Sequence, residues 1–304
     1  MKNITAIGEI LYDIYPDEKR LGGAPFNFIY HVWKITAKAN FVSSVGNDEN
    51  GKEILVYLNS IGFNTNYISV DDKHPTGTVQ VRIRDDKTPQ FTISPECSYD
   101  FFTLNEKTKN LIDNETDIIY FGTLSQRSEP SRKTMEFVLN KNKKYFCDLN
   151  LRHDFYTKEL IKQSLVASNV LKLNSDELEK LKSLFGLSPS TPMAIHELIY
   201  EFNIDILCVT LGADGAILST KNEMSTYKTR NISPIDTLGA GDAYAAVLCL
   251  GYLNEMPIDE INKLANEFAS EICMVNGALP KDDSIYEKYR MVFKSWRSLK
   301  SNIF

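Results

Sequence analysis

The feature that most constrains the fold of this chain is a regular alternation of short apolar segments with helix-like segments. Each apolar segment has the length of a buried strand, and strands separated by helices form a parallel sheet that is covered on both faces. We therefore predict an α/β fold with a doubly wound, mostly parallel sheet flanked by helices. The expected strands are residues 4–10, 39–45, 118–121, 145–149, 170–173 and 206–211, and the expected helices are residues 26–35, 51–61, 131–141, 176–185, 191–202 and 243–253.

Two stretches interrupt this alternation. Residues 11–21 are short and polar, whereas residues 78–84 alternate polar and apolar side chains, turn at 85–87 and return over 90–94. This pattern predicts a β-hairpin with Asp85 and Asp86 as turn residues rather than catalytic carboxylates. The sequence has no linker rich in proline or serine, so we expect one domain over residues 1–304. A small β-sheet from residues 11–22 and 76–101 would protrude from it.

Length and charge narrow the class of protein. The chain has 304 residues, of which 43% are hydrophobic and 24% charged, as in globular proteins. A net charge of −6 argues against nucleic acid or an anionic membrane surface as the main partner. The N-terminus lacks the pattern of a signal peptide, and the longest apolar stretch, residues 243–253, is too short to span a bilayer. The five cysteines show no metal-ligand spacing, which fits free thiols in a reducing cytoplasm.

The run Gly239-Ala240-Gly241-Asp242 directly precedes the apolar helix predicted over 243–253. Backbone N–H groups at such a turn form a concave site for an anion, and glycine lets the main chain approach it closely. Asp242 would stand where it can take a proton from a hydroxyl group. These are the two requirements of phosphoryl transfer to an alcohol, charge stabilisation and a positioned base. The alternative is an ordinary turn with an aspartate that caps the helix.

A second glycine-containing run, residues 46–53, nearly matches a phosphate-binding Walker A loop. Glu53 stands where that motif needs Ser or Thr for Mg²⁺, and Asp48 and Glu49 would repel phosphates. We therefore interpret the run as a loop that caps the next helix.

Polar residues follow three expected strands, at the edge where open α/β sheets place ligands. Asn174 and Glu177 have the spacing of a capping box, or Glu177 holds the hydration shell of a nucleotide-bound Mg²⁺. Thr210 opens a run to Gly215 that either cradles nucleotide phosphates or forms an ordinary turn.

The third polar set alternates along the end of an expected strand. Asp148, Asn150 and Arg152 would share one face, where Arg152 meets phosphate or sugar oxygens, or where the set forms an internal ion pair or turn cap. Near the N-terminus, Asp13 and Asn27 either bind the hydroxyls of a polyol or are an ordinary surface residue and a helix-start residue.

In this order the motifs resemble the ribokinase-like (PfkB) carbohydrate kinase family, over essentially the whole chain. The most specific part is the run 236–242, which is similar to the C-terminal signature of the family, and the runs 22–27 and 45–51 are similar to its N-terminal signature. Within the family, residues 22–27, 76–81 and 148–152 look most like bacterial fructokinases. The run 148–150 departs from many relatives, which place proline between its two polar residues.

The resemblance implies a kinase that transfers the γ-phosphoryl group of ATP to a primary hydroxyl of a sugar, with fructose as the expected acceptor. It assigns Asp242 as the base and Gly239, Ala240 and Gly241 as the anion hole. It implies Mg²⁺ held through water by Glu177, and, in relatives that use potassium, an ion near Asp236 and Thr237. The implied sugar-binding residues are Asp13, Gly22, Gly23, Asn27, Gln80 and Arg152. The implied nucleotide-binding residues are Asn174, Thr210, Gly212, Gly215, Asn266, Ala269 and Gly277.

The resemblance leaves alternatives open. The acceptor is fructose, or instead ribose, a nucleoside or 2-keto-3-deoxygluconate. A sugar-binding regulator that has lost turnover is the alternative from another class of protein. The fold of the family is a doubly wound domain whose small β-sheet acts as a lid, and in many relatives two lids pair to form a homodimer.

Overall fold

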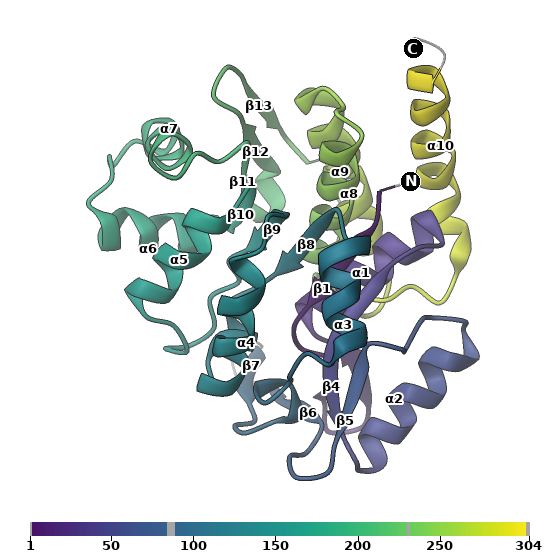
Figure 1. Ribbon diagram of the computed structural model, residues 1–304. Coiled ribbons are helices and arrows are strands. Elements are labelled where there is room, and N and C mark those ends of the chain that lie inside the picture. Colours follow the sequence, from purple (N-terminus) through teal and green to yellow (C-terminus); the bar gives the residue numbers. More distant parts are fainter. Residues whose placement is uncertain (1, 84–88, 230–231, 302–304) are drawn as a thin grey trace.

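The computed structural model describes residues 2–83, 89–229 and 232–301, so the predicted turn at Asp85 and Asp86 lies outside the described residues. Within them, the main sheet has nine strands, and the seven from β11 to β5 run parallel (Figure 1). The hairpin of β12 and β13 adds an antiparallel edge beside β11. In spatial order the strands are β13 (Met224–Tyr227), β12 (Ala216–Ser219), β11 (Ile206–Thr210), β10 (Val170–Asn174), β9 (Lys144–Asp148), β8 (Ile118–Phe121), β1 (Ile4–Ile7), β4 (Asn40–Gly46) and β5 (Ile68–Asp71).

Helices cover both faces of this sheet, and neighbouring strand residues alternate between the two resulting cores. Tyr120 belongs to one core and Phe121 to the other, as the pleat of a strand requires. The first core takes side chains from α1 (Ala24–Thr36), α2 (Glu49–Ser60), α8 (Ala240–Leu253), α9 (Ile258–Ile272) and α10 (Glu287–Ser301). The second takes them from η2 (Leu111–Glu115), which continues α3 (Glu106–Asn110), and from α4 (Glu129–Leu139), α5 (Lys158–Ala167), α6 (Ser175–Phe185) and α7 (Thr191–Phe202). The doubly wound fold is therefore confirmed.

A second, smaller sheet has four strands, of which Figure 1 labels β6 and β7. Its order is β3 (Lys19–Gly22), β2 (Leu11–Ile14), β6 (Gly77–Ile83) and β7 (Pro89–Ile93). The hairpin predicted from the alternation forms β6 and β7, whose buried side chains pack with Cys97, Tyr99 and Leu124. These strands and the main sheet therefore have separate apolar cores.

The single strand predicted over residues 4–10 is wrong, because the chain leaves the main sheet after Ile7. Gly8 has a φ of 153°, and a Cβ there would lie 2.5 Å from Cγ of Pro25. The chain then enters the small sheet as β2, so Glu9 lies between the two sheets in sequence and Asp13 lies within β2.

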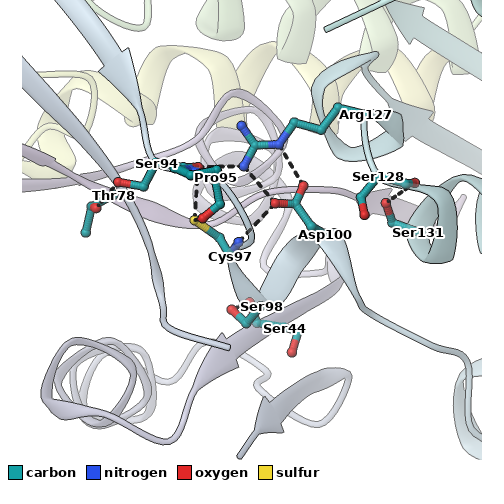
Figure 2. Close-up of polar contacts among 10 residues, drawn as sticks. All are labelled: Ser44, Thr78, Ser94, Pro95, Cys97, Ser98, Asp100, Arg127, Ser128 and Ser131. Atoms are coloured by element: carbon teal, nitrogen blue, oxygen red, sulfur yellow. Dashed lines mark hydrogen bonds and ion pairs between the residues drawn. The ribbon is translucent and has the colours of Figure 1, made fainter. Parts of the chain in front are cut away.

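A buried arginine ties the small sheet to the rest of the domain (Figure 2). Arg127 follows η3 (Leu124–Gln126), and it donates from Nε and Nη2 to the two carboxylate oxygens of Asp100 at 2.8 and 2.7 Å. Nη2 also donates to the carbonyl of Ser94, just after β7, at 2.6 Å. Both charged side chains are buried, so this ion pair fixes the chain where β7 ends.

Two smaller predictions are confirmed. Asp48 caps α2 by accepting from the N–H of Gly51 at 2.8 Å, so the Walker-like run is a capping loop. Asp48 also accepts from the N–H and the hydroxyl of Thr76, which joins this loop to the start of β6. Four of the cysteines are buried free thiols, and Cys273 is partly buried. Over the described ranges, every helix is too short or too polar to cross a membrane.

Candidate active site

The start of α8 has the geometry of an anion site. Gly239 caps the helix in the left-handed conformation, with a φ of 77°, and a Cβ there would lie 2.4 Å from Cβ of Ala278. Only glycine fits this position without displacing that neighbour. The helix that follows has 14 residues, and the N–H groups of its first turn have no acceptor within the helix. Their partial positive charge faces the turn that contains Ala240 and Gly241.

Asp242 lies in this first turn and meets a side chain from the other end of the sequence. Nδ2 of Asn27, on α1, donates to Oδ2 of Asp242 at 2.8 Å. Asp242 as a whole residue is only partly buried. Desolvation raises its pKa to about 7, with a further upward push from Asp148, while Asn27, Lys172 and Arg152 oppose the rise. Such a pKa suits a general base at neutral pH.

A buried lysine that the sequence analysis missed stands beside the anion site. Lys172, on β10, donates to both carboxylate oxygens of Asp148 at 3.0 and 2.8 Å, and its Nζ lies 3.3 Å from where a Cβ on Gly241 would be. Burial alone would lower the pKa of Lys172, but the Asp148 carboxylate raises it to about 12. A fixed positive charge therefore stands next to the anion-hole backbone. The signal in the sequence was a single lysine inside the apolar run Val170–Asn174.

The set of alternating residues at the end of β9 is not one face of a strand. The strand ends at Asp148, and Asn150 has a φ of 43° in the left-handed region, so the alternation stops there. Asp148 forms the internal ion pair that was the alternative reading, and it also accepts from the hydroxyl of Tyr120 at 3.1 Å. Arg152 is exposed at the rim, where its charge lowers the pKa values of Asp13, Glu9 and Asp242.

The residues expected to bind sugar converge, with one exception. Asp13 on β2 is 8% exposed. Its Oδ2 lies 2.9 Å from where a Cβ on Gly22 would stand, so the absence of a side chain on Gly22 leaves room for this carboxyl group. Gly23 has a φ of 109° and packs against the Glu9 carbonyl in the same way. Burial raises the pKa of Asp13 to about 6, against the opposing charges of Arg152 and Arg20.

Gln80 is the exception. It is exposed and follows Val79, which is the residue in register with Asp13. Because successive residues of a strand point to opposite faces, Gln80 lies on the face of the small sheet away from Asp13. Its predicted contact with sugar is not supported by this placement.

Two buried polar atoms in this region lack a partner among the described residues. They are Oδ1 of Asn27, whose amide nitrogen is bound to Asp242, and Oε2 of Glu9. Burial raises the pKa of Glu9 to about 7; Arg152 and Arg127 lower it and Asp242 raises it. No local motif in the sequence predicts a role for Glu9. Buried atoms of this kind normally find a hydrogen bond, so both are suited to the hydroxyl groups of a ligand.

At the other end of the site, the capping box predicted for Asn174 and Glu177 is present. Each residue accepts from the other's N–H at 2.8 Å, and Oε1 of Glu177 accepts from the N–H of Leu151 at 2.7 Å. Glu177 is buried, and desolvation raises its pKa. Within the described ranges, no three His, Cys, Asp or Glu side chains group in a way that would cage a metal ion.

The other residues expected to bind the nucleotide differ in their surroundings. Thr210 is in register with Asn174, so the two strand ends lie side by side, and Gly212 faces open space. Gly215 is required by packing instead, since a Cβ there would lie 1.9 Å from the Tyr227 carbonyl. On α9, the Asn266 amide donates to Asn262, with Ala269 about one turn further along. These contacts leave the nucleotide roles as predictions.

Asp236, expected near a monovalent cation, is held by three donors. Its Oδ2 accepts from Nη1 of Arg20 at 2.9 Å and from the N–H of Gly277 at 3.1 Å, and its Oδ1 accepts from the N–H of Leu238 at 3.0 Å. Gly277 therefore lies beside the loop of the predicted anion hole, and the backbone carbonyl of the exposed Thr237 accepts from the N–H of Ala240 at 3.3 Å.

Comparison with known proteins places this geometry in a family. Residues 1–283 match the pfkB family of carbohydrate kinases. The chain is 29% identical to the sugar kinase PH1459 of Pyrococcus horikoshii, over 94% of this chain and 95% of that protein. It is 27% identical to a fructokinase of Salmonella typhimurium, over 84% of this chain and 86% of the relative.

Solved structures of kinases have a similar fold. PH1459 in complex with ATP superposes with a TM-score of 0.81 at 26% identity, covering 95% of this chain and 99% of that one. A Vibrio cholerae fructokinase double mutant with bound fructose, ADP and potassium gives a TM-score of 0.78 at 22% identity, covering 96% and 98%. This second likeness shows the fold alone. The chain belongs to the pfkB family of carbohydrate kinases.

Proposed function

We propose that this protein transfers the γ-phosphoryl group of ATP to a primary hydroxyl of a free sugar, with fructose giving fructose 6-phosphate as the preferred reaction. The observation that carries the proposal is the meeting of Asp242, Asn27 and Lys172 at the start of α8. A base, an orienting amide and a fixed cation surround one anion-hole turn. That is the set of groups that phosphoryl transfer to an alcohol requires.

Asp242 acts as the base in this proposal. Its carboxylate accepts the proton of the sugar hydroxyl as the oxygen–phosphorus bond forms and the bond from the γ-phosphorus to the ADP oxygen breaks. The hydrogen bond from Asn27 fixes the orientation of the carboxylate. With a pKa of about 7, the group is largely ionised above neutral pH and still basic enough to take a proton.

The start of α8 balances the charge of the transferred group. The Gly239–Gly241 backbone and the helix dipole offer partial positive charge, and Lys172 adds a full charge beside Gly241. Because Asp148 already holds Lys172 in place, this charge is preorganised and needs no movement during the reaction.

A neutral polyol suits the acceptor side of the site. Asp13 and Glu9 are buried carboxyl groups, and Asn27 offers an unpartnered oxygen to a hydroxyl donor. Two buried acids disfavour an acceptor that carries its own carboxylate, such as 2-keto-3-deoxygluconate. Fructokinase names among the relatives, at 26–28% identity in bacteria, support fructose in particular.

The nucleotide would lie across the ends of β10 and β11, beside Thr210 and Gly212. Glu177 would meet Mg²⁺ only through waters that the ion keeps, because both oxygens of its carboxylate already accept backbone N–H groups. When bound, Mg²⁺ neutralises phosphate charge. Glu177 and Asn174 would orient its waters, while Asn266, Ala269 and Gly215 belong to the proposed nucleotide side.

We also propose that the small sheet, about residues 11–22 and 76–101, is a lid that closes over the sugar in a cytoplasmic homodimer. Phe91 on its edge strand β7 is 39% exposed, and an exposed edge with an apolar side chain favours pairing with a second copy. Light scattering of wild type and Phe91→Asp tests this: a dimer that becomes a monomer supports pairing through β7.

The experiment that tests the reaction is a coupled ADP-release screen with fructose, ribose, adenosine and 2-keto-3-deoxygluconate, each with ATP and Mg²⁺. We expect sugar-dependent ADP formation with the highest kcat/KM for fructose. A higher value for another acceptor would move the assignment to that acceptor. Tight sugar binding without any ADP formation would instead favour the non-catalytic regulator.

A further inference from the structure

A contact between the small sheet and the anion-hole loop points to a source of positive charge inside the chain. Arg20 lies on β3, and Asp236 lies three residues before Gly239 in the loop that leads into α8. Nη1 of Arg20 donates to Oδ2 of Asp236 at 2.9 Å, and both side chains are only 22% exposed. The resemblance to relatives that use potassium implies an ion near Asp236.

The guanidinium is held firmly from its other side. Nε donates to Oε1 of Glu18 at 2.9 Å, and Nη2 contacts the same oxygen. The group also stacks over the Tyr15 ring, 4.5 Å from its centre. Charge-assisted hydrogen bonds and stacking together restrict an arginine to one orientation. Arg20 therefore reaches Asp236 as a fixed group.

The carboxylate of Asp236 fits a bound potassium ion poorly. Both of its oxygens already accept hydrogen bonds, from Arg20, Gly277 and Leu238. Bound potassium needs several oxygen atoms in place of its water shell, and a second cation at this carboxylate would be repelled by a guanidinium that is always charged.

The same arginine connects two parts of the site. On the ladder between β2 and β3 it is directly opposite Asp13, the residue expected to bind sugar. Asp236 in turn anchors the loop through the N–H of Leu238, and Thr237 accepts from the N–H of Ala240 at the entrance to α8. The position of the small sheet is thereby linked to the shape of the anion hole.

We propose that the Arg20 guanidinium takes the place of a bound monovalent cation at Asp236, so that phosphoryl transfer needs no potassium and the small sheet itself sets the anion-hole loop. This inference rests on the proposed kinase function. In this respect the chain would differ from the Vibrio cholerae fructokinase structure, which contains a potassium ion.

The first test compares initial rates for the wild-type protein with K⁺, Na⁺ or tetramethylammonium as the only monovalent cation, at matched ionic strength and with ATP, Mg²⁺ and fructose. The proposal predicts the same rate in all three. A rate that falls about tenfold or more when K⁺ is withdrawn would overturn it.

The second test uses variants. Arg20→Met should be about tenfold slower without K⁺ and partly restored by K⁺, because removal of the guanidinium vacates the carboxylate. Restoration should vanish in Arg20→Met/Asp236→Asn, whereas Arg20→Lys should keep most of the activity. Arg82→Met removes an exposed arginine of strand β6 and serves as the matched control, with no response to the choice of cation. An Arg20→Met protein indistinguishable from wild type in every buffer would contradict the proposal.

A third readout does not depend on turnover. Thermal melting of wild type should show no difference between KCl and NaCl, while Arg20→Met should be stabilised by KCl alone. Potassium-specific stabilisation of wild type would overturn the inference even if every sugar proved inactive. A wild type that phosphorylates no sugar, yet shows this melting pattern, would refute the proposed reaction and retain the cation assignment.

Discussion

Asn27 and Asp242, 215 positions apart in the sequence, are joined by a hydrogen bond of 2.8 Å at the start of α8. This bond brings the first helix of the chain to the carboxyl group proposed as the base. It is also the main side-chain hydrogen bond that restrains the pKa of Asp242 against the effect of burial.

The rise of kcat/KM on the acid side of its pH profile should depend on the hydrogen bond between Asn27 and Asp242. The base must be ionised, so kcat/KM for sugar should rise through an apparent pKa near 7. Asn27→Ala removes a hydrogen bond to the charged form and should move that rise to higher pH. Asn47→Ala, on an exposed amide that binds Asp72, is the control. An Asn27→Ala profile that moves to lower pH would contradict the assignment.

Stability should fall as pH rises through the range in which Asp242 ionises. Its folded pKa of about 7 exceeds the usual 3.8, so the folded protein binds this proton more tightly than the unfolded chain. The stabilisation is therefore complete below about pH 4 and lost as pH approaches 7. Asp242→Asn should remove the contribution of Asp242 to this dependence and be more stable than wild type at pH 8, by on the order of 2 kcal/mol. Glu9 and Asp13, whose pKa values are also raised, should leave part of the slope in the variant. Urea denaturation of both proteins at pH 5 and pH 8 measures the difference. If the free energy of unfolding changed by the same amount between these pH values in both proteins, Asp242 would be excluded as the source of the pH dependence.

The pair Lys172–Asp148 should separate stability from catalysis. Lys172→Met leaves a buried carboxylate without its partner and should cost about 3–5 kcal/mol. The double variant Lys172→Met/Asp148→Asn should recover part of that loss in chemical denaturation. Turnover should stay about tenfold low in both, because the charge beside Gly241 is absent. Recovery of turnover along with stability would show that Lys172 acts only through folding.

The ion pair between Arg127 and Asp100 should stabilise the domain and fix the end of strand β7 in the small sheet. Arg127→Met should destabilise the protein by about 3–5 kcal/mol and raise the KM for sugar more than that for ATP. Lys133→Met, which breaks an exposed ion pair with Glu129, is the control and should leave both properties unchanged. If Arg127→Met raised both KM values equally, the ion pair would have no particular link to the sugar side.

Much of the fold followed from local patterns. Buried strands such as Val170–Asn174 and helices such as Thr191–Phe202 carry their own apolar periodicity, and the cap at Asp48 lies within four residues of its helix. The edge strands β5 and β13, and β12 beside β13, escaped prediction because each has only four residues and contains polar side chains. Helix α9 escaped as well, although Ile258, Ile261, Leu264 and Phe268 mark its buried face.

The site was less accessible from sequence because its contacts join distant segments. Arg20 and Asp236 are 216 positions apart, and no local pattern links a strand of the small sheet to a loop near the C-terminus. A role for Glu9 can be suggested only when its burial is known. The face on which Gln80 lies follows only from the register of β2 and β6. Roles for the residues of the glycine signature could be predicted because their chemistry is local to one turn.

The most direct measurement is single-turnover phosphoryl transfer to fructose by wild type and Asp242→Asn, with the ATP dissociation constant measured for both. The carboxamide keeps the shape of the side chain but cannot take the proton. The account predicts a rate about 10²–10⁴-fold lower with ATP affinity nearly unchanged. A rate close to that of wild type would contradict Asp242 as the base and with it the proposed mechanism.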